Sequence, residues 1–205
     1  MASKIDIINL ALTHLAEQPI NALDEGSEPA NVMSRLYGIA LDSEVRDWPY
    51  TWATRTVELA LIEEEEALDF RYVYQLPADY VMIDRIVDGR TGTSLYTYNE
   101  AGAYLDVRYQ EWEIREDKLY INSSAVCLEY RVLEEDTTKW DASFVMAFSY
   151  KLAELAGPAI TEKESFVQRA AQYYVRHVNK ARSSNGAERH RAPRMSEDYL
   201  NARNT

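Results

Sequence analysis

The spacing of apolar residues changes twice along the chain, and this feature constrains the fold more than any other. Near the start, Ile5, Ile8 and Leu12 recur at intervals of three and four residues, which is the spacing of an amphipathic helix. From about residue 55 to 132, apolar residues tend to alternate with polar ones, as they do in a half-buried strand. The helical spacing returns after Asp141. Helices on both sides of a β region predict an α+β chain.

Capping and breaking residues predict where four helices begin and end. Ser3 and Asp141 are suited to cap the first and third helices, and Pro29 fits the first turn of the second. Gly157-Pro158 should end the third helix, and the run from Ser183 to Gly186 should end the fourth. The expected helices cover about 3–17, 29–47, 141–157 and 161–182.

Two further patterns refine the second and fourth helices. An apolar stripe through Val32, Leu36 and Ile39 is expected to face the core in the second helix. Thr161 and Glu164 have the spacing of a capping box at the start of the fourth helix.

The segment between the helices is expected to be an antiparallel β region over about 55–132. Turn signals at Asp88-Gly89 and Asn122 to Ser124 separate its alternating runs. The complete expectation is an α+β fold, a helical bundle of about four helices with an inserted antiparallel β region and a flexible C-terminal tail. A single domain is expected over residues 1–182, followed by the tail over 183–205.

Charge is distributed unevenly along the 205 residues, which together carry a net charge of -12. From Lys163 onward, nine Lys and Arg stand against four Asp and Glu, which gives +5 and leaves -17 for residues 1–162. The acidic body argues against tight wrapping of nucleic acid, because such binding needs cations to replace the counterions of phosphates. It does not exclude the passage of nucleic acid through a pore.

No membrane or secretion signal is expected from the sequence. No apolar run approaches the roughly 18 residues of a membrane-spanning helix. Met1 to Leu15 is amphipathic and lacks the basic segment and cleavage site of a signal peptide. Cys127 is the only cysteine, which excludes an intramolecular disulfide and fits a reducing cytoplasm.

Motifs that carry catalysis are missing from the sequence. It has no Walker loop, no Gly-rich dinucleotide fingerprint, no zinc-ligand spacing and no G-x-S-x-G elbow. His14, His177 and His190 have no Cys or second His at ligand spacing. We therefore expect no enzyme, no catalytic residue, no metal site and no cofactor.

One candidate functional segment is a run of four carboxylates at Glu63, Glu64, Glu65 and Glu66. A calcium loop would need alternating ligands and a glycine, which this run lacks. It is either a solvated acidic loop or, if the protein forms a ring, a loop that lines the lumen and repels DNA so that the DNA slides.

The second candidate is the C-terminal tail. It is either a disordered end or a segment that becomes ordered on a partner, with arginines that pair with acidic groups and apolar residues that act as anchors. The residues expected to contact the portal or a neighbouring subunit are Arg189, Arg191, Arg194, Met195, Tyr199 and Leu200.

Several segments in order along residues of about 1–180 resemble one known family. They are Ile8-Asn9, Leu15 to Ile20, Leu36-Tyr37, Leu41 to Val45, Asp47 to Thr54, Phe70 to Tyr80 with its L-P-x-D-Y turn, Leu128 to Val132, Trp140 to Phe144, Leu152 to Ala156 and Ile160-Thr161. Together they resemble tail tubular protein A, the head-to-tail adaptor family of short-tailed bacteriophages. Ala16 departs from the family, in which we expect Gly, and the tail beyond Arg182 carries no family motif.

The resemblance implies a structural virion protein without enzymatic activity. Its adaptor domain would assemble with itself into a ring, expected to be dodecameric, between the portal protein and the tail nozzle protein. The ring would extend the channel through which double-stranded DNA passes without sequence-specific binding. The subunit would be made in the host cytoplasm, end in the virion tail and contact no membrane.

Two other classes remain open at this point. A virion-associated glycan or peptidoglycan hydrolase would need a carboxylate pair in a cleft, and the acidic residues offer too many candidates to name one. A non-viral cytoplasmic protein-interaction module would share the same helix and sheet pattern.

Overall fold

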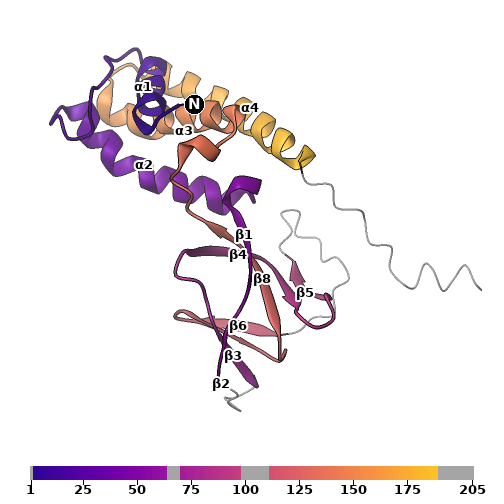
Figure 1. The fold of residues 1–205 in the computed structure, drawn as a ribbon. Helices are drawn as coiled ribbons and strands as arrows, with labels where there is room; N and C mark the ends of the chain where they lie inside the picture. Colours follow the sequence, from indigo (N-terminus) through magenta and orange to yellow (C-terminus); the bar gives the residue numbers. More distant parts are fainter. Residues whose placement is uncertain (1, 64–69, 98–110, 189–205) are drawn as a thin grey trace, which may run out of the picture. The chain divides into compact units, whose positions relative to one another are not determined.

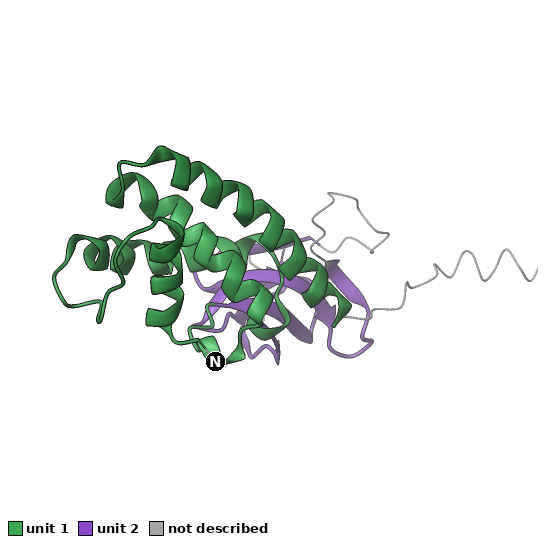
Figure 2. Cartoon of the chain, turned by 90° about the horizontal axis from the view of Figure 1, so that it is seen from above, with its two compact units in different colours: residues 1–53, 133–189 green, residues 54–132, 190–205 purple. Residues whose placement is uncertain are grey.

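The computed structural model describes residues 2–63, 70–97 and 111–188 (Figure 1). The chain forms two compact units (Figure 2). Among the described residues, the helical unit is built from two separate stretches, residues 2–53 and 133–188, and the β unit lies between them in sequence, within residues 54–132. The β segment is thus inserted into a helical unit whose two halves lie far apart along the chain.

The structure corrects the predicted fold. A helical bundle with one inserted β region was the expectation, whereas the described residues form four α-helices and two separate antiparallel sheets of four strands each. The fold is α+β, with helices and sheets both present. Alternating apolar residues mark strands but carry no information about which strands pair, so the division into two sheets lay beyond the sequence pattern.

The helical unit contains four α-helices and two short 3-10 helices. Ser3 and Asp141 cap α1 and α3 as predicted, and Pro29 stands in the first turn of α2. No helix in the described ranges combines the length and apolar character needed to cross a membrane. The bounds are α1 Lys4–His14, α2 Glu28–Asp47, η1 Thr51–Ala53, η2 Thr137–Lys139, α3 Ala142–Ile160 and α4 Glu164–Ala187.

Helix α1 ends three residues before the expected position because the chain turns at Ala16. This residue has a φ of 57°, in the left-handed region. The Glu17 N–H donates to the Leu12 carbonyl at 3.0 Å, and the Ala16 N–H donates to the Thr13 carbonyl at 3.1 Å. The two bonds form a Schellman motif, in which glycine usually holds the left-handed position.

Replacing Ala16 with glycine should stabilise the protein, because glycine adopts positive φ without the steric cost that a Cβ imposes. We expect the free energy of unfolding to rise by about 1 kcal/mol. Chemical denaturation would measure the change. Ala171→Gly, inside α4, is the matched control and should instead lower the free energy of unfolding by about 1 kcal/mol. A destabilised Ala16→Gly variant would contradict the assigned turn.

The ends of α3 and α4 also differ from expectation. Helix α3 continues through Gly157 and Pro158 to Ile160, because Pro158 lies in the exposed last turn, where few further helical bonds are lost. Helix α4 begins at Glu164 with no side-chain cap, so Thr161 and Glu164 do not form the predicted capping box.

Helix α4 continues to Ala187, so the first residues assigned to a flexible tail are helical. Asn185 is buried within this predicted breaking sequence. Its side chain accepts a hydrogen bond from the Thr51 N–H at 3.2 Å and donates one to Thr51 Oγ1 at 2.8 Å. This tertiary contact outweighs the weak helix propensity of the Ser-Ser-Asn-Gly run.

An aromatic cluster forms the core of the helical unit. Phe144 is fully buried, with its ring centroid 4.7 Å from those of Tyr50 and Trp52 and 5.1 Å from that of Trp140. Ile39, by contrast, is 65% exposed, so the predicted stripe of α2 is wrong at this position. The buried face of α2 instead contains Val32, Met33, Tyr37, Ala40, Leu41, Glu44 and Val45.

The two sheets of the β unit share one apolar core, which includes Ile83, Leu119, Ile121 and Leu128. One sheet has the strand order β1-β8-β4-β5 and the other β2-β3-β7-β6. The bounds are β1 Thr54–Glu58, β2 Leu61–Glu63, β3 Tyr72–Gln75, β4 Tyr80–Asp88, β5 Ser94–Thr97, β6 Trp112–Arg115, β7 Lys118–Ile121 and β8 Val126–Val132.

Candidate functional site

A buried polar network joins α2 to α4. Glu44 of α2 is 1% exposed, and its carboxylate accepts a hydrogen bond of 2.5 Å from the hydroxyl of Tyr174 on α4. Burial raises the pKa of the Glu44 carboxyl, while the hydrogen bond from Tyr174 and the nearby Lys151 and Arg182 act in the opposite direction. Burial and the Glu44 charge likewise raise the pKa of Tyr174. The network fastens α4 to the rest of the helical unit.

Arg182 extends this network on α4. Its guanidinium carbon lies 5.3 Å from the ring centroid of Trp48, a distance at which a cation is attracted to an aromatic face. Burial lowers the pKa of Arg182, but its interactions with Tyr50, Tyr174 and Glu44 outweigh burial and raise the pKa above the ordinary value. A catalytic acid or base must be reachable by its substrate, so an almost fully buried Glu44 points to a structural role.

A second cluster stacks three rings from α1, α3 and α4. The ring centroid of Tyr150 on α3 lies 3.8 Å from that of His14 on α1 and 5.1 Å from that of His177 on α4. Burial lowers the pKa of His14 to about 4, and His177 contributes to the shift. His14 is therefore neutral at pH 7.

His14 also contacts a serine in the arrangement that a nucleophilic hydrolase would use, and the geometry opposes that chemistry. His14 Nε2 lies 3.1 Å from Ser149 Oγ. The Ser149 hydroxyl donates to the Met146 carbonyl at 2.8 Å and is fully buried. With its proton committed there, Ser149 accepts from His14 rather than donating to a base, the reverse of an activated nucleophile.

Two cavities lie in the helical unit. The first, of about 210 Å³, is bordered by His14, Tyr150 and Arg169. The second, of about 450 Å³, lies between α3 and α4 beside Glu154 and Glu162. In the part of the chain that the structure describes, no three His, Cys, Asp or Glu side chains converge to hold a metal ion.

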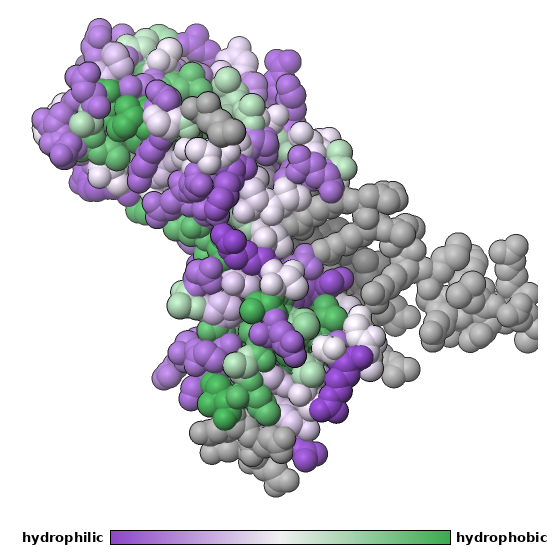
Figure 3. All heavy atoms as spheres, viewed as in Figure 1, coloured by the Kyte–Doolittle hydropathy of each residue, from purple (hydrophilic) through white to green (hydrophobic). Residues whose placement is uncertain are grey.

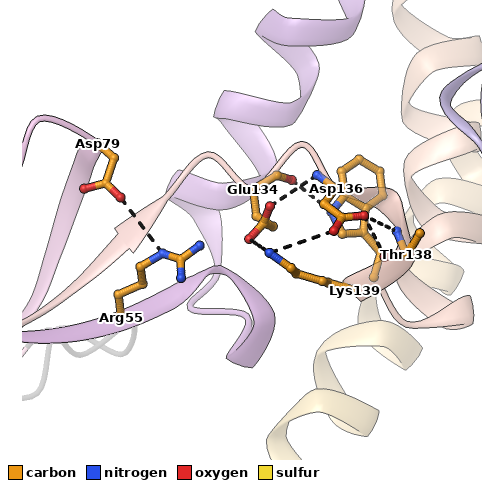
Figure 4. Close-up of polar contacts among 7 residues, drawn as sticks. Arg55, Asp79, Glu134, Asp136, Thr138 and Lys139 are labelled. Atoms are coloured by element: carbon orange, nitrogen blue, oxygen red, sulfur yellow. Dashed lines mark hydrogen bonds and ion pairs between the residues drawn. The ribbon is translucent and has the colours of Figure 1, made fainter.

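Ion pairs are also found in each unit close to where the inserted segment begins and ends (Figure 4). In the β unit, Arg55 Nε lies 4.0 Å from Asp79 Oδ2, and the Tyr130 hydroxyl donates to Asp79 Oδ1 at 3.1 Å. In the helical unit, Lys139 Nζ donates to Glu134 Oε2 at 2.6 Å. Asp79, in the L-P-x-D-Y turn, therefore ties β4 to β8.

Exposed apolar residues mark the outer strands of the β unit. Val57 of β1 is 36% exposed, and Leu61 and Ile62 of β2 are 42% and 39% exposed. Each strand is the outermost described strand of its sheet, and the visible face of this unit shows hydrophobic residues among hydrophilic ones (Figure 3). Exposed apolar side chains on the outer strands of a sheet are typical of contact surfaces.

The predicted site residues fall mostly outside the described ranges. Glu63 is the last residue of β2, and Glu64, Glu65 and Glu66 are not described. The predicted contact residues Arg189, Arg191, Arg194, Met195, Tyr199 and Leu200 also lie beyond the described residues. The burial of Glu44 and Asn185 was not predicted from the sequence. The sequence indicates it only in that each is a polar residue at a position where the helical repeat places the core.

No protein-family model matches this chain, and no curated protein gives a significant match. What the chain does must therefore be inferred from its own residues.

Proposed function

We propose that the chain is a ring-forming head-to-tail adaptor of a short-tailed bacteriophage. In this role it is a structural virion protein of the tail that joins the portal protein to the tail nozzle protein. Copies of the chain, expected to number twelve, form a ring that extends the channel for double-stranded DNA. The protein performs no chemical reaction in this role.

The observation that carries the proposal is the convergence of the segments that resemble the adaptor family. Leu36-Tyr37, Asp47 to Thr54 and Trp140 to Phe144 are separated by up to about a hundred residues in sequence. Their rings nevertheless meet in the aromatic cluster of the helical unit. Residues that specify the helical unit of a family are expected to pack together in this way.

The turn after α1 supports the same assignment. Ala16 is the position at which the resemblance calls for glycine, and its backbone has the positive φ that favours glycine. Ala16 thus departs from the family pattern at a position whose backbone conformation still favours glycine.

Surface features favour assembly over catalysis. The exposed apolar residues of β1 and β2 are suited to contact another protein. The buried positions of Glu44 and Ser149 remove two of the groups that a hydrolase would use. A ring needs two different complementary surfaces on each subunit, and a chain with an acidic body and a basic end can supply them.

Binding to the portal ring encoded in the same genome tests the proposal. The purified chain should co-sediment with portal rings. A chain ending at Glu188 tests the role of the C-terminal segment, and we expect it to bind more weakly. Undiminished binding would remove that segment from the docking mechanism, whereas failure of the full chain to bind would contradict the proposed function.

A further inference from the structure

One face of α4 carries a stripe of cations without carboxylates. Arg169, Tyr173, Arg176 and Lys180 follow one another at intervals of four, three and four residues, so they lie along one side of the helix. All four are exposed. We call these four residues the basic stripe. Between Ser165 and Ala187 the helix contains four Lys and Arg and no Asp or Glu.

The cations of the basic stripe are not neutralised within the described part of the chain. No described carboxylate forms an ion pair with Arg169, Arg176 or Lys180, and Arg169 instead lies with its guanidinium carbon 4.5 Å from the ring centroid of Phe166. Tyr173 is 40% exposed and Val175, on the neighbouring face, is 57% exposed. Cations around exposed aromatic and aliphatic groups have the composition of a protein-binding surface.

The same helical unit carries a surface of the opposite sign. Residues 5–34 contain five Asp and Glu and no Lys or Arg. Asp24, Glu25 and Glu28 are exposed where the chain passes from α1 into α2, and we call them the acidic turn. The Glu25 carboxylate accepts hydrogen bonds from Ser27 Oγ at 2.6 Å and the Asn21 N–H at 2.8 Å, which hold its pKa below the ordinary value.

The C-terminal part of the basic stripe lies apart from the acidic turn within the helical unit. The loop between α1 and α2 and the C-terminal part of α4 occupy opposite ends of this unit in both views (Figures 1 and 2). The C-terminal part of the basic stripe therefore lies too far along the unit to pair with the acidic turn of its own copy, and it can meet that of another. Two different complementary surfaces at opposite ends produce head-to-tail association, which closes into a ring when the rotation between copies allows.

We propose that the basic stripe on α4 of one copy binds the acidic turn between α1 and α2 of the next copy. This inference rests on the proposed ring and names the contact between its subunits. Electrostatic complementarity would set the order and orientation of the copies. Salt screens exposed charges, so the contact weakens as ionic strength rises.

Double-stranded DNA is the competing occupant of the basic stripe, and the observations favour a second copy. Binding to duplex DNA depends on many cations that displace counterions, whereas the stripe supplies three on a chain of net charge -12. A second copy offers the carboxylates of its acidic turn, which attract the cations of the stripe.

A charge exchange tests the proposal. Arg176→Glu/Lys180→Glu reverses the basic stripe, and Asp24→Lys/Glu28→Lys reverses the acidic turn while keeping Glu25 and its hydrogen bonds. Self-association is measured by sedimentation velocity at high protein concentration and low salt. Each variant alone should associate at least about tenfold more weakly than the wild type, and their equimolar mixture should recover association, because opposite charges then face each other.

Thermal unfolding of each variant separates loss of contact from loss of fold. The proposal is overturned if the wild type remains monomeric, if folded variants associate as the wild type does, or if the mixture fails to recover. It is also overturned if Arg176→Glu/Lys180→Glu loses binding to a DNA duplex in fluorescence anisotropy while its self-association is unchanged.

The outcomes also separate this inference from the proposed function. If portal binding occurs and neither charge variant alters self-association, the subunit contact is wrong and the adaptor role stands. If charge exchange restores self-association but the wild type does not bind portal rings, the contact stands and the adaptor role is wrong.

Discussion

Replacing Asp84 with alanine should lower the free energy of unfolding by about 3 to 5 kcal/mol, because it leaves a buried cation without its partner. Arg131 on β8 is 0% exposed, its Nε donates to Asp84 Oδ1 on β4 at 2.8 Å, and its Nη2 lies 2.6 Å from the same oxygen in an ion pair. The two strands are neighbours within one sheet. Chemical denaturation followed by circular dichroism would measure the loss.

Two controls identify the cause of that loss. Glu113→Ala removes an ion pair with Arg115 in the same unit, but both side chains are more than a third exposed, so the loss should be small beside that of Asp84→Ala. Asp84→Leu/Arg131→Met replaces the buried pair by apolar groups and should recover most of the lost stability. A double variant as unstable as Asp84→Ala would show that the unpaired charge is not the cause.

Replacing Phe144 with alanine should cost about 3 to 5 kcal/mol through lost burial and the cavity left behind. The ring is fully buried and contacts Tyr50, Trp52, Trp140 and Phe148, so its neighbours come from α3 and from the segments that flank the inserted β unit. This loss approaches the whole stability of a marginal domain, which is about 5 to 15 kcal/mol. The melting temperature and the denaturation midpoint would report it.

Phe144→Leu is the matched control, because leucine keeps most of the apolar volume. It should cost less than half as much as Phe144→Ala. Equal losses in the two variants would indicate that the aromatic geometry, with ring centroids 4.7 to 5.6 Å apart, matters more than filled volume.

Local signals predicted the starts of helices better than their ends. Ser3 accepts a hydrogen bond from the Asp6 N–H and Asp141 from the Phe144 N–H, as expected of residues that cap helices. Such caps depend on atoms three residues away, so the sequence contains the relevant information. The end of α4 depends on Asn185 and Thr51, which are 134 residues apart, and no local pattern reports that contact.

The misassigned residues have similar explanations. Pro158 was expected to stop α3, but it lies in the last turn on an exposed face. Ile39 fits the helical repeat of α2 and is nevertheless 65% exposed, whereas a polar residue of the same helix, Glu44, is buried with a hydrogen bond from Tyr174. Apolar periodicity describes where burial is favourable in general, whereas the packing partners decide which side of a helix is buried.

The β unit and the candidate site show the same limit. Alternation located the strand-rich segment but not its two sheets, because pairing joins residues such as Val57 and Leu128 from distant parts of the chain. The buried network of Glu44, Tyr174 and Arg182 likewise joins a helix that precedes the inserted segment in sequence to one that follows it. Sequence spacing gives no measure of such distances, so neither feature was predicted.

Electron microscopy of the chain mixed with portal rings tests the central claim most directly. The adaptor role predicts that closed rings of this chain appear on one end of the portal, share its axis and leave an open central channel. Class averages that show bare portals, or copies of the chain bound without a closed ring, would contradict it.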